Sequence, residues 1–256
     1  MILSKYQGTG NDFVIVDNRD NTYNLSKKEI STICDRRFGI GADGFMFLEK
    51  HDTYDFVMRY FNADGGEASM CGNGGRCIVA FAKQIGIITK KTTFLAVDGI
   101  HEATIENNNV SIKMQDVNSI ELFDNNYFMN TGSPHFVKFI DSPIDFNTYE
   151  QGKKIRYSDL FAKEGVNVNF VSYIDNGINV LTYERGVEDE TFSCGTGVVA
   201  SCIASYINDK SKGTDIMVET KGGKLNVSFD YISNNLVENI WLTGPAQEVF
   251  EGEIKI

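Results

Sequence analysis

The chain carries two copies of one short pattern, in which an extended stretch ends at a cysteine and is followed by Gly-x-Gly and a helix. The copies are Met70-Cys71-Gly72-Asn73-Gly74 in the first half and Ser193-Cys194-Gly195-Thr196-Gly197 in the second. Glycine permits a sharp turn there and leaves backbone N–H groups uncovered. Both cysteines should therefore lie at a helix N-terminus, whose partial positive charge favours a thiolate and binds a carboxylate.

The segments around the two cysteines repeat as well. Strand-like runs over 54–62 and 178–185 precede them, and apolar residues at helical spacing follow them. After each helix, turn residues at Asp98-Gly99 and Gly222-Gly223 predict a β-hairpin. We therefore predict an α+β fold of two pseudo-symmetric domains, each a central helix wrapped by mostly antiparallel strands.

The domain boundary is placed in a polar segment without periodicity, Asp116 to Asn126. The predicted domains cover residues 1–117 and 118–246. The last strand, 247–256, is expected to return to the first domain.

Charge and hydrophobicity narrow the class of partner. The net charge is −11, and no run of lysine or arginine marks a surface for nucleic acid or an anionic membrane. We therefore expect a small-molecule substrate. No apolar stretch reaches the roughly 18 residues of a spanning helix, and the first residues do not form a signal peptide. These features predict a cytoplasmic protein, and they leave a homodimer open.

The cysteine count of five in a chain of 256 residues argues for reduced thiols rather than a disulfide framework. Cys34, Cys77 and Cys202 fall within helical apolar patterns, so we interpret them as buried structural thiols.

Sites for a metal or a cofactor are not expected. The His, Cys and carboxylate residues lack the spacing of a metal site. Residues 39–44 fit G-x-G-x-x-G, but a helical pattern precedes them instead of the strand that a dinucleotide site requires.

A pair of thiols at two helix N-termini suits proton transfer at a carbon next to a carboxylate. One thiolate removes the proton from one face, and the other thiol returns a proton to the opposite face. Charge that develops on the carboxylate is stabilised by the helix N–H groups, which act as an oxyanion hole. Cys71 and Cys194 are thus the predicted acid and base, without a cofactor.

The chain resembles the diaminopimelate epimerase family over essentially its full length. The segments that carry the resemblance are 8–13 (GTGNDF), 35–44 (DRRFGIGADG), 61–65 (FNADG), 70–77 (MCGNGGRC), 165–170 (GVNVNF), 183–186 (YERG) and 194–197 (CGTG). The resemblance implies a cofactor-independent conversion of LL-2,6-diaminopimelate to the meso isomer, in lysine and peptidoglycan biosynthesis. It also implies an active site between the two domains.

The same resemblance implies roles for individual residues. Backbone N–H groups at Gly72-Asn73 and Gly195-Thr196 would hold the reacting carboxylate. His135 would support the reacting centre. The residues implied to position the substrate and read its distal end are Asn11, Asn62, Asn167, Glu184 and Arg185. Arg185 offers a planar fork for the distal carboxylate.

Two positions depart from the family pattern, Ser133 where the family has asparagine and Gly44 where many members have glutamine. Both concern substrate recognition, so two alternatives stay open. One is a two-cysteine racemase of proline, hydroxyproline or histidine, although the proline type resembles Cys-Gly-His at the first site. The other is a non-catalytic amino-acid-binding or thiol redox protein.

Overall fold

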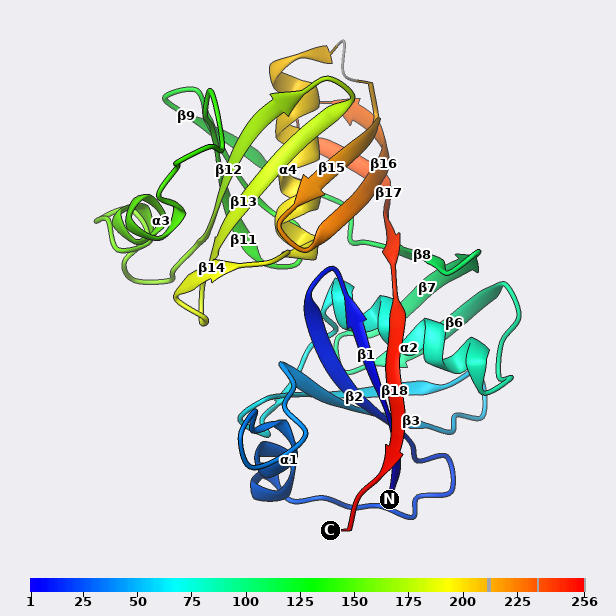
Figure 1. Cartoon of the computed structure of the whole chain (residues 1–256). Helices are drawn as coiled ribbons and strands as arrows, with labels where there is room; N and C mark the ends of the chain where they lie inside the picture. The colour runs from blue at the N-terminus through cyan, green and yellow to red at the C-terminus, as the bar shows by residue number, and fades with distance from the viewer. Residues whose placement is uncertain (211–212, 234, 256) are drawn as a thin grey trace. The chain divides into compact units, whose positions relative to one another are not determined.

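The computed structural model describes residues 1–210, 213–233 and 235–255. It divides into two compact units: unit 1 comprises Met1–Ile112 with Gly244–Ile256, and unit 2 comprises Lys113–Thr243. Figure 1 shows each unit as strands gathered around one long helix, α2 in unit 1 and α4 in unit 2.

The elements of unit 1 are β1 (Ile2–Gly8), β2 (Asn11–Asp17), α1 (Lys27–Cys34), β3 (Gly44–Glu49), β4 (Val57–Asn62), β5 (Glu67–Ala68), α2 (Gly72–Gln84), β6 (Lys91–Ala96), β7 (Gly99–Glu106), β8 (Asn109–Lys113) and β18 (Gln247–Glu253). Those of unit 2 are β9 (Ile120–Phe123), β10 (Asn126–Asn130), β11 (Pro134–Phe139), α3 (Thr148–Arg156), β12 (Asn167–Ile174), β13 (Gly177–Glu184), β14 (Asp189–Thr191), α4 (Gly195–Asn208), β15 (Asp215–Thr220), β16 (Gly223–Ser233) and β17 (Leu236–Pro245).

Strand pairing follows the same scheme in both units. In unit 1, β2 and β3 run parallel, β3 and β4 antiparallel, β4 and β6 parallel, and β6 and β7 antiparallel. In unit 2 the same alternation joins β11 to β12, β12 to β13, β13 to β15 and β15 to β16. The pairs β1–β2, β7–β8, β10–β11 and β16–β17 are antiparallel, so the prediction of an α+β fold with mostly antiparallel strands is confirmed.

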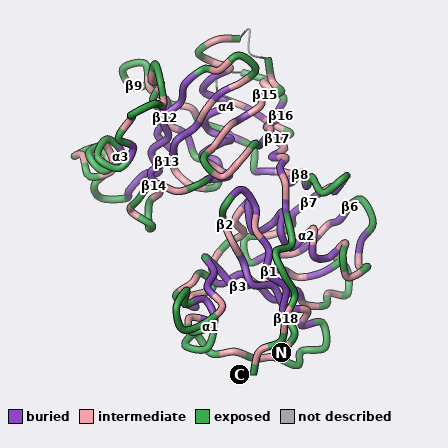
Figure 2. Tube along the Cα trace, viewed as in Figure 1, coloured by how far each residue is buried: buried purple, intermediate pink, exposed green. Residues whose placement is uncertain are grey.

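The two cysteine helices lie where the apolar periodicity places them. In Figure 2 most of α2 and α4 is coloured as buried. Ile78, Val79 and Ala82 are buried on α2, and Val198, Val199 and Ile203 are buried on α4. The strands that contact α2 and α4 also pack against the smaller helices: one cluster of buried side chains in unit 1 includes Ile30 and Ile33 of α1, and a cluster in unit 2 packs against Ile155 of α3.

The last strand of the chain belongs to unit 1. β18 pairs antiparallel with β1, from Ile2 opposite Glu253 to Gln7 opposite Gln247. In unit 2 the strand in the corresponding place is β9, which pairs antiparallel with β10. Residues 116–126, where the sequence analysis puts the domain boundary, thus include a strand of unit 2.

Candidate active site

Each of the two predicted catalytic cysteines is the N-cap residue of the central helix of its unit. Cys71 has extended backbone angles (φ −96°, ψ 133°), and its carbonyl accepts the first helical hydrogen bond, from Gly75 N at 2.7 Å. Cys194 is also extended (φ −118°, ψ 112°) and accepts from Val198 N at 2.9 Å. Backbone N–H groups of the first turn have no acceptor within the helix, so both cysteines border a potential anion site.

In unit 1, Cys71 lies in a cluster of amide side chains. Its Sγ is 3.7 Å from Asn11 Oδ1, and Asn73 Nδ2 donates to the same oxygen at 3.3 Å. Asn11 Nδ2 in turn donates to the Asp43 carboxylate at 2.6 Å, which fixes the orientation of the Asn11 amide. The structure thus brings together Cys71, Asn11 and Asn73, which the sequence analysis assigned to one site.

A group of charges next to this cluster holds the β1–β2 turn in place. Asp12 forms ion pairs with Lys5 at 2.7 Å and with Arg36 at 2.7 Å, and Arg36 also pairs with Asp43 at 2.6 Å. Burial alone would raise the pKa of Asp12, but hydrogen bonds from Arg36 and Lys5 outweigh it and hold the pKa well below its ordinary value. The carboxylates of Asp12 and Asp43 are therefore already bound to cations.

In unit 2, Cys194 is 9% exposed and is linked to a buried chain of hydrogen bonds. Its Sγ is 3.5 Å from Thr196 Oγ1, which is 2.8 Å from Nε2 of the fully buried His135. On the other side of the ring, Asn169 Nδ2 is 3.0 Å from His135 Nδ1, and Asn169 Oδ1 faces the Thr182 hydroxyl at 3.0 Å.

The partners of His135 determine its tautomer. Asn169 Nδ2 also donates to the Phe136 carbonyl, which identifies it as the nitrogen and makes Nδ1 of His135 an acceptor. The proton of the neutral ring is then on Nε2, which donates to Thr196 Oγ1. Burial, with the charge of Arg185, lowers the pKa of His135 to about 3, so the ring stays neutral at physiological pH. The Thr196 hydroxyl hydrogen is left available for Cys194 Sγ.

The remaining predicted positions lie at strand ends. In unit 2, Asn167 Nδ2 donates to Ser133 Oγ at 2.9 Å and to the Pro134 carbonyl at 3.1 Å, and Asn167 Oδ1 accepts from Arg185 N at 2.9 Å. The Arg185 guanidinium donates to the Glu164 carbonyl at 3.0 Å. No carboxylate of the described residues forms an ion pair with it, and so it has no ion pair with the neighbouring Glu184, which ends β13.

The other three thiols are buried, as predicted. Burial raises the pKa of Cys34 to about 11 and that of Cys77 to about 12, and it raises the pKa of Cys202 as well. These thiols stay protonated and cannot replace Cys71 or Cys194 as a base.

Comparison with known proteins identifies the family. The model of the family described as diaminopimelate epimerase matches residues 3–120 and 127–249. A diaminopimelate epimerase of Flavobacterium psychrophilum is 51% identical over 99% of this chain and 100% of its own length. The chain belongs to the diaminopimelate epimerase family. The diaminopimelate epimerase of Chlorobaculum tepidum is 38% identical over 97% of this chain and 99% of its own length.

Solved structures of more distant proteins share the fold of this epimerase family. A phenazine biosynthesis protein of the PhzF family from Bacillus anthracis superposes with a TM-score of 0.75 at 17% identity, covering 100% of this chain and 99% of its own. A probable proline racemase from Agrobacterium radiobacter gives a TM-score of 0.66 at 13% identity, covering 100% and 93%. At these identities the likeness concerns the fold alone.

The two departures from the epimerase pattern have structural counterparts. Ser133 accepts a hydrogen bond from Asn167, so the Asn167 amide is held by the chain itself. Gly44, which starts β3 opposite Asn62, lies against Tyr60: a Cβ there would be 2.4 Å from Tyr60 Cε2. The Tyr60 ring thus occupies the space that a longer side chain at position 44 would need.

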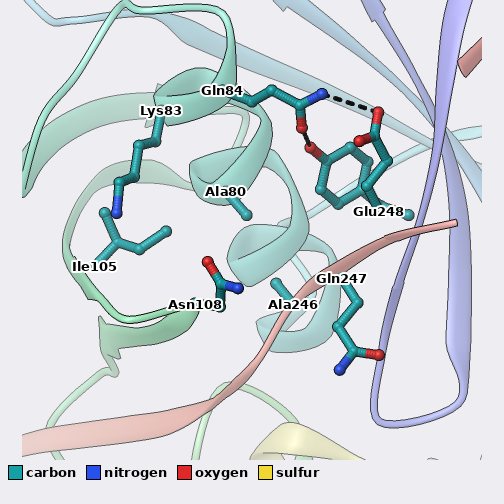
Figure 3. Close-up of a pocket in the computed structure, with 9 residues that line it drawn as sticks. Ala80, Lys83, Gln84, Ile105, Asn108, Ala246, Gln247 and Glu248 are labelled. Carbon is teal, nitrogen blue, oxygen red and sulfur yellow. Dashed lines mark hydrogen bonds between the residues drawn. The ribbon is translucent and has the colours of Figure 1, made fainter. Parts of the chain in front are cut away.

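A pocket of about 560 Å³ lies elsewhere on unit 1, along the C-terminal half of α2. Figure 3 shows Gln84 bound there to Glu248, to which Gln84 Nε2 donates at 2.9 Å. Gln84 Oε1 accepts a hydrogen bond from the Tyr6 hydroxyl. Its lining is Tyr6, Ala80, Lys83, Gln84, Ile105, Asn108, Ala246, Gln247 and Glu248. None of the predicted site residues lines it.

The sequence analysis predicts neither a metal site nor a membrane-spanning helix. Within the described ranges, no group of three or more His, Cys, Asp or Glu side chains could hold a metal ion. Among the same residues, no helix is both long and apolar enough to cross a membrane.

Proposed function

We propose that this chain epimerises LL-2,6-diaminopimelate to the meso isomer without a cofactor, in lysine and peptidoglycan biosynthesis. The observation that carries the proposal is the repeated placement of a cysteine at the N-cap of the central helix of each unit. The family match over nearly the whole chain and the 51% identity to a diaminopimelate epimerase support this substrate.

The two cysteines act on opposite faces of one α-carbon. A thiolate at one cysteine takes the α-proton, so that the C–H bond breaks and an S–H bond forms. The thiol at the other cysteine gives its proton to the opposite face and becomes the thiolate. The configuration at the α-carbon is inverted, and after each turnover the other cysteine is the thiolate.

The negative charge of the intermediate flows into the α-carboxylate. We assign its stabilisation to backbone N–H groups at Gly72-Asn73 and Gly195-Thr196, in the first turns of α2 and α4. Such donors are fixed before the reaction and need no reorganisation as the charge develops. His135 contributes by holding the Thr196 hydroxyl toward Cys194.

The distal amino-acid end of the substrate is assigned to polar residues at strand ends. Arg185 is the cation for the distal carboxylate, because its guanidinium has no ion pair within the described residues. Asn167 bonds the backbone N–H of Arg185 and so fixes where that side chain begins. We assign the remaining substrate contacts to Asn11, Asn62 and Glu184.

The oligomeric state and compartment complete the proposal. We propose a homodimer that forms through β18, whose pairing with β1 leaves its other edge without a partner among the described strands and which exposes Val249 and Phe250. Light scattering on the intact protein tests the homodimer, since a monomer at micromolar concentration would contradict this proposal.

We also propose a cytoplasmic location. All five cysteines are thiols in the described structure, which suits a reducing cytoplasm.

A substrate comparison tests the assignment against its alternatives. The protein is offered LL-diaminopimelate, proline, hydroxyproline and histidine in heavy water, and exchange of each α-proton is followed by NMR. We expect kcat/KM for LL-diaminopimelate to exceed the others at least tenfold. A preference of that size for another amino acid would support the racemase alternative. Exchange of none of them would support a binding or redox protein.

A further inference from the structure

Arg76, in the second turn of α2, is a completely buried charge without an acidic partner. Its side chain is 0% exposed. The guanidinium donates to the Gly72 carbonyl at 3.3 Å, to Thr9 Oγ1 at 3.1 Å and to Asn73 Oδ1 at 3.0 Å, and its Nε faces the Pro245 carbonyl at 3.5 Å. All these acceptors are neutral, and no carboxylate of the described residues pairs with Arg76.

A buried charge of this kind needs a reason beyond packing. Removing a cation from water costs several kcal/mol unless an opposite charge and good hydrogen bonds compensate it. An arginine nevertheless stays protonated in proteins. Hydrogen bonds to neutral acceptors alone would not explain why a full charge is kept here.

The second copy of the repeat shows that the fold does not require this charge. Arg76 stands five residues after Cys71, and the residue five positions after Cys194 is Val199. Val199 is fully buried on α4, as Arg76 is on α2. An uncharged side chain therefore fills the same helical position in a unit of the same topology.

The anions that could compensate Arg76 are few. Arg76 is linked to Cys71 through two amides, because it donates to Asn73 Oδ1 and both Asn73 Nδ2 and Cys71 Sγ contact Asn11 Oδ1. A thiolate at Cys77 or Cys71 acts to raise the pKa of Arg76, against the lowering effect of burial. Burial raises the pKa of Cys77 itself to about 12, so that thiol stays neutral. Cys71 is left as the group that can supply a negative charge, and its neighbour Gly72 holds one end of the guanidinium.

Four acidic residues on the elements around α2, or just before them, are bound to partners of their own. Asp12 and Asp43 are paired with Lys5 and Arg36, Asp98 is 3.3 Å from His101, and Glu248 accepts from Gln84. Tyr6 on β1 is protonated at physiological pH, because burial and nearby carboxylates raise its pKa.

We propose that Arg76 is a positioning residue whose buried cation stabilises the thiolate form of Cys71. This inference rests on the proposed role of Cys71 as an acid and base. Thr9 and Asn73 hold the guanidinium beneath the first turn of α2, and Gly8 gives it room, since a Cβ on Gly8 would be 3.4 Å from Nη2 and 3.2 Å from Asn73 O.

The test measures the thiolate directly and needs no substrate. The intact protein reacts with iodoacetamide between pH 5 and 10, and peptide mass spectrometry follows the rate at Cys71, with Cys194 as the internal control. In Arg76→Met we expect the alkylation rate at Cys71 to fall about tenfold at pH 7. This fall corresponds to a rise of about one unit in the pH at which half of the Cys71 thiol is deprotonated. The rate at Cys194 should not change, and Arg76→Lys should keep the wild-type midpoint within about half a unit.

At high pH Cys71 is fully deprotonated, so the plateau of the alkylation rate shows whether a variant changes the access of iodoacetamide to this thiol. The midpoint pH shows whether the variant changes the stability of the thiolate. If Arg76→Met does not fold, Arg76→Gln keeps an amide donor for the Gly72 carbonyl and is used instead. A folded, uncharged variant with the wild-type midpoint at Cys71 would overturn the inference. Failure of the proposed function appears elsewhere, as absence of α-proton exchange with an intact Cys71 midpoint.

Discussion

At the scale of single residues, the two cysteines have unlike surroundings although they share a backbone position. Cys71 is near a buried cation and the amides of Asn11 and Asn73, whereas Cys194 faces a hydroxyl held by a neutral histidine. His135 does not titrate near neutral pH, so we expect it to orient Thr196 rather than to carry the substrate proton.

A pH dependence of stability tests the state of His135. Its pKa is about 3 when folded and 6.5 ordinarily. Between these values the unfolded chain binds the proton and the native protein does not, so the free energy of unfolding falls as the pH drops below about 6.5. The slope contribution of one such group approaches about 1.4 kcal/mol per pH unit.

His135→Gln keeps an amide for Thr196 but removes this titration. Urea unfolding at pH 7, 6, 5 and 4 should therefore give a shallower loss of stability in His135→Gln than in the wild type. Parallel curves for the two proteins would show that His135 takes up its proton over the same pH range in the native protein as in the unfolded chain, which would contradict the lowered pKa.

At the scale of elements, the second glycine after each cysteine serves different neighbours. A Cβ on Gly197 would lie 2.3 Å from Asn169 Oδ1 and 3.3 Å from His135 Cε1. A Cβ on Gly74, at the same place in α2, would be in ordinary contact with the Phe13 ring at 3.4 Å. Only in α4 does the glycine permit a close approach of buried polar side chains.

This difference predicts a matched pair of outcomes. Gly197→Ala should lower the free energy of unfolding by about 1–3 kcal/mol through overpacking and reduce epimerisation at least tenfold, because Asn169 and His135 must move. Gly74→Ala should be neutral or stabilising by up to about 1 kcal/mol, because alanine favours a helix. Urea titrations and activity measurements on both variants check this, and equal losses would contradict it.

The individual elements also show which parts of the fold and of the site could be predicted from the sequence. The glycines, turn residues and apolar spacing predicted both helix starts, the hairpins and the fold class, because these depend on local chemistry. The bond between His135 and Asn169 depends on the parallel register of β11 and β12, which no local pattern reveals. Arg76 was missed because an arginine within a helix ordinarily indicates an exposed face; its contrast with Val199 was the available signal.

At the scale of the whole molecule, the chain repeats one topology, but the two units take one strand of it from different parts of the sequence. In unit 2, β10 pairs with β9, the strand just before it in the chain, whereas in unit 1 the corresponding strand β1 pairs with β18, from the last part of the sequence. The contact from the Met1 amino group to the Ile254 carbonyl, 2.7 Å, joins the two ends of the chain within unit 1.

The proposed mechanism requires that both cysteines reach one carbon, which predicts their oxidation behaviour. Without substrate, air oxidation should join Cys71 to Cys194 and abolish activity, and a thiol reductant should restore it. Peptide mass spectrometry identifies the bond. Inactivation with both thiols still reduced, or through Cys34, Cys77 or Cys202, would contradict the proximity of the pair.

The most direct test of the two-base mechanism is the position of deuterium in the first turnovers. LL-diaminopimelate is converted in heavy water, and NMR measures the α-deuterium content of product and remaining substrate separately. Because one cysteine removes a proton and the other delivers a deuteron from solvent, the early meso product should carry deuterium at the inverted carbon while the remaining LL substrate keeps hydrogen. Deuterium appearing equally in both isomers from the start would show a single base and contradict the account.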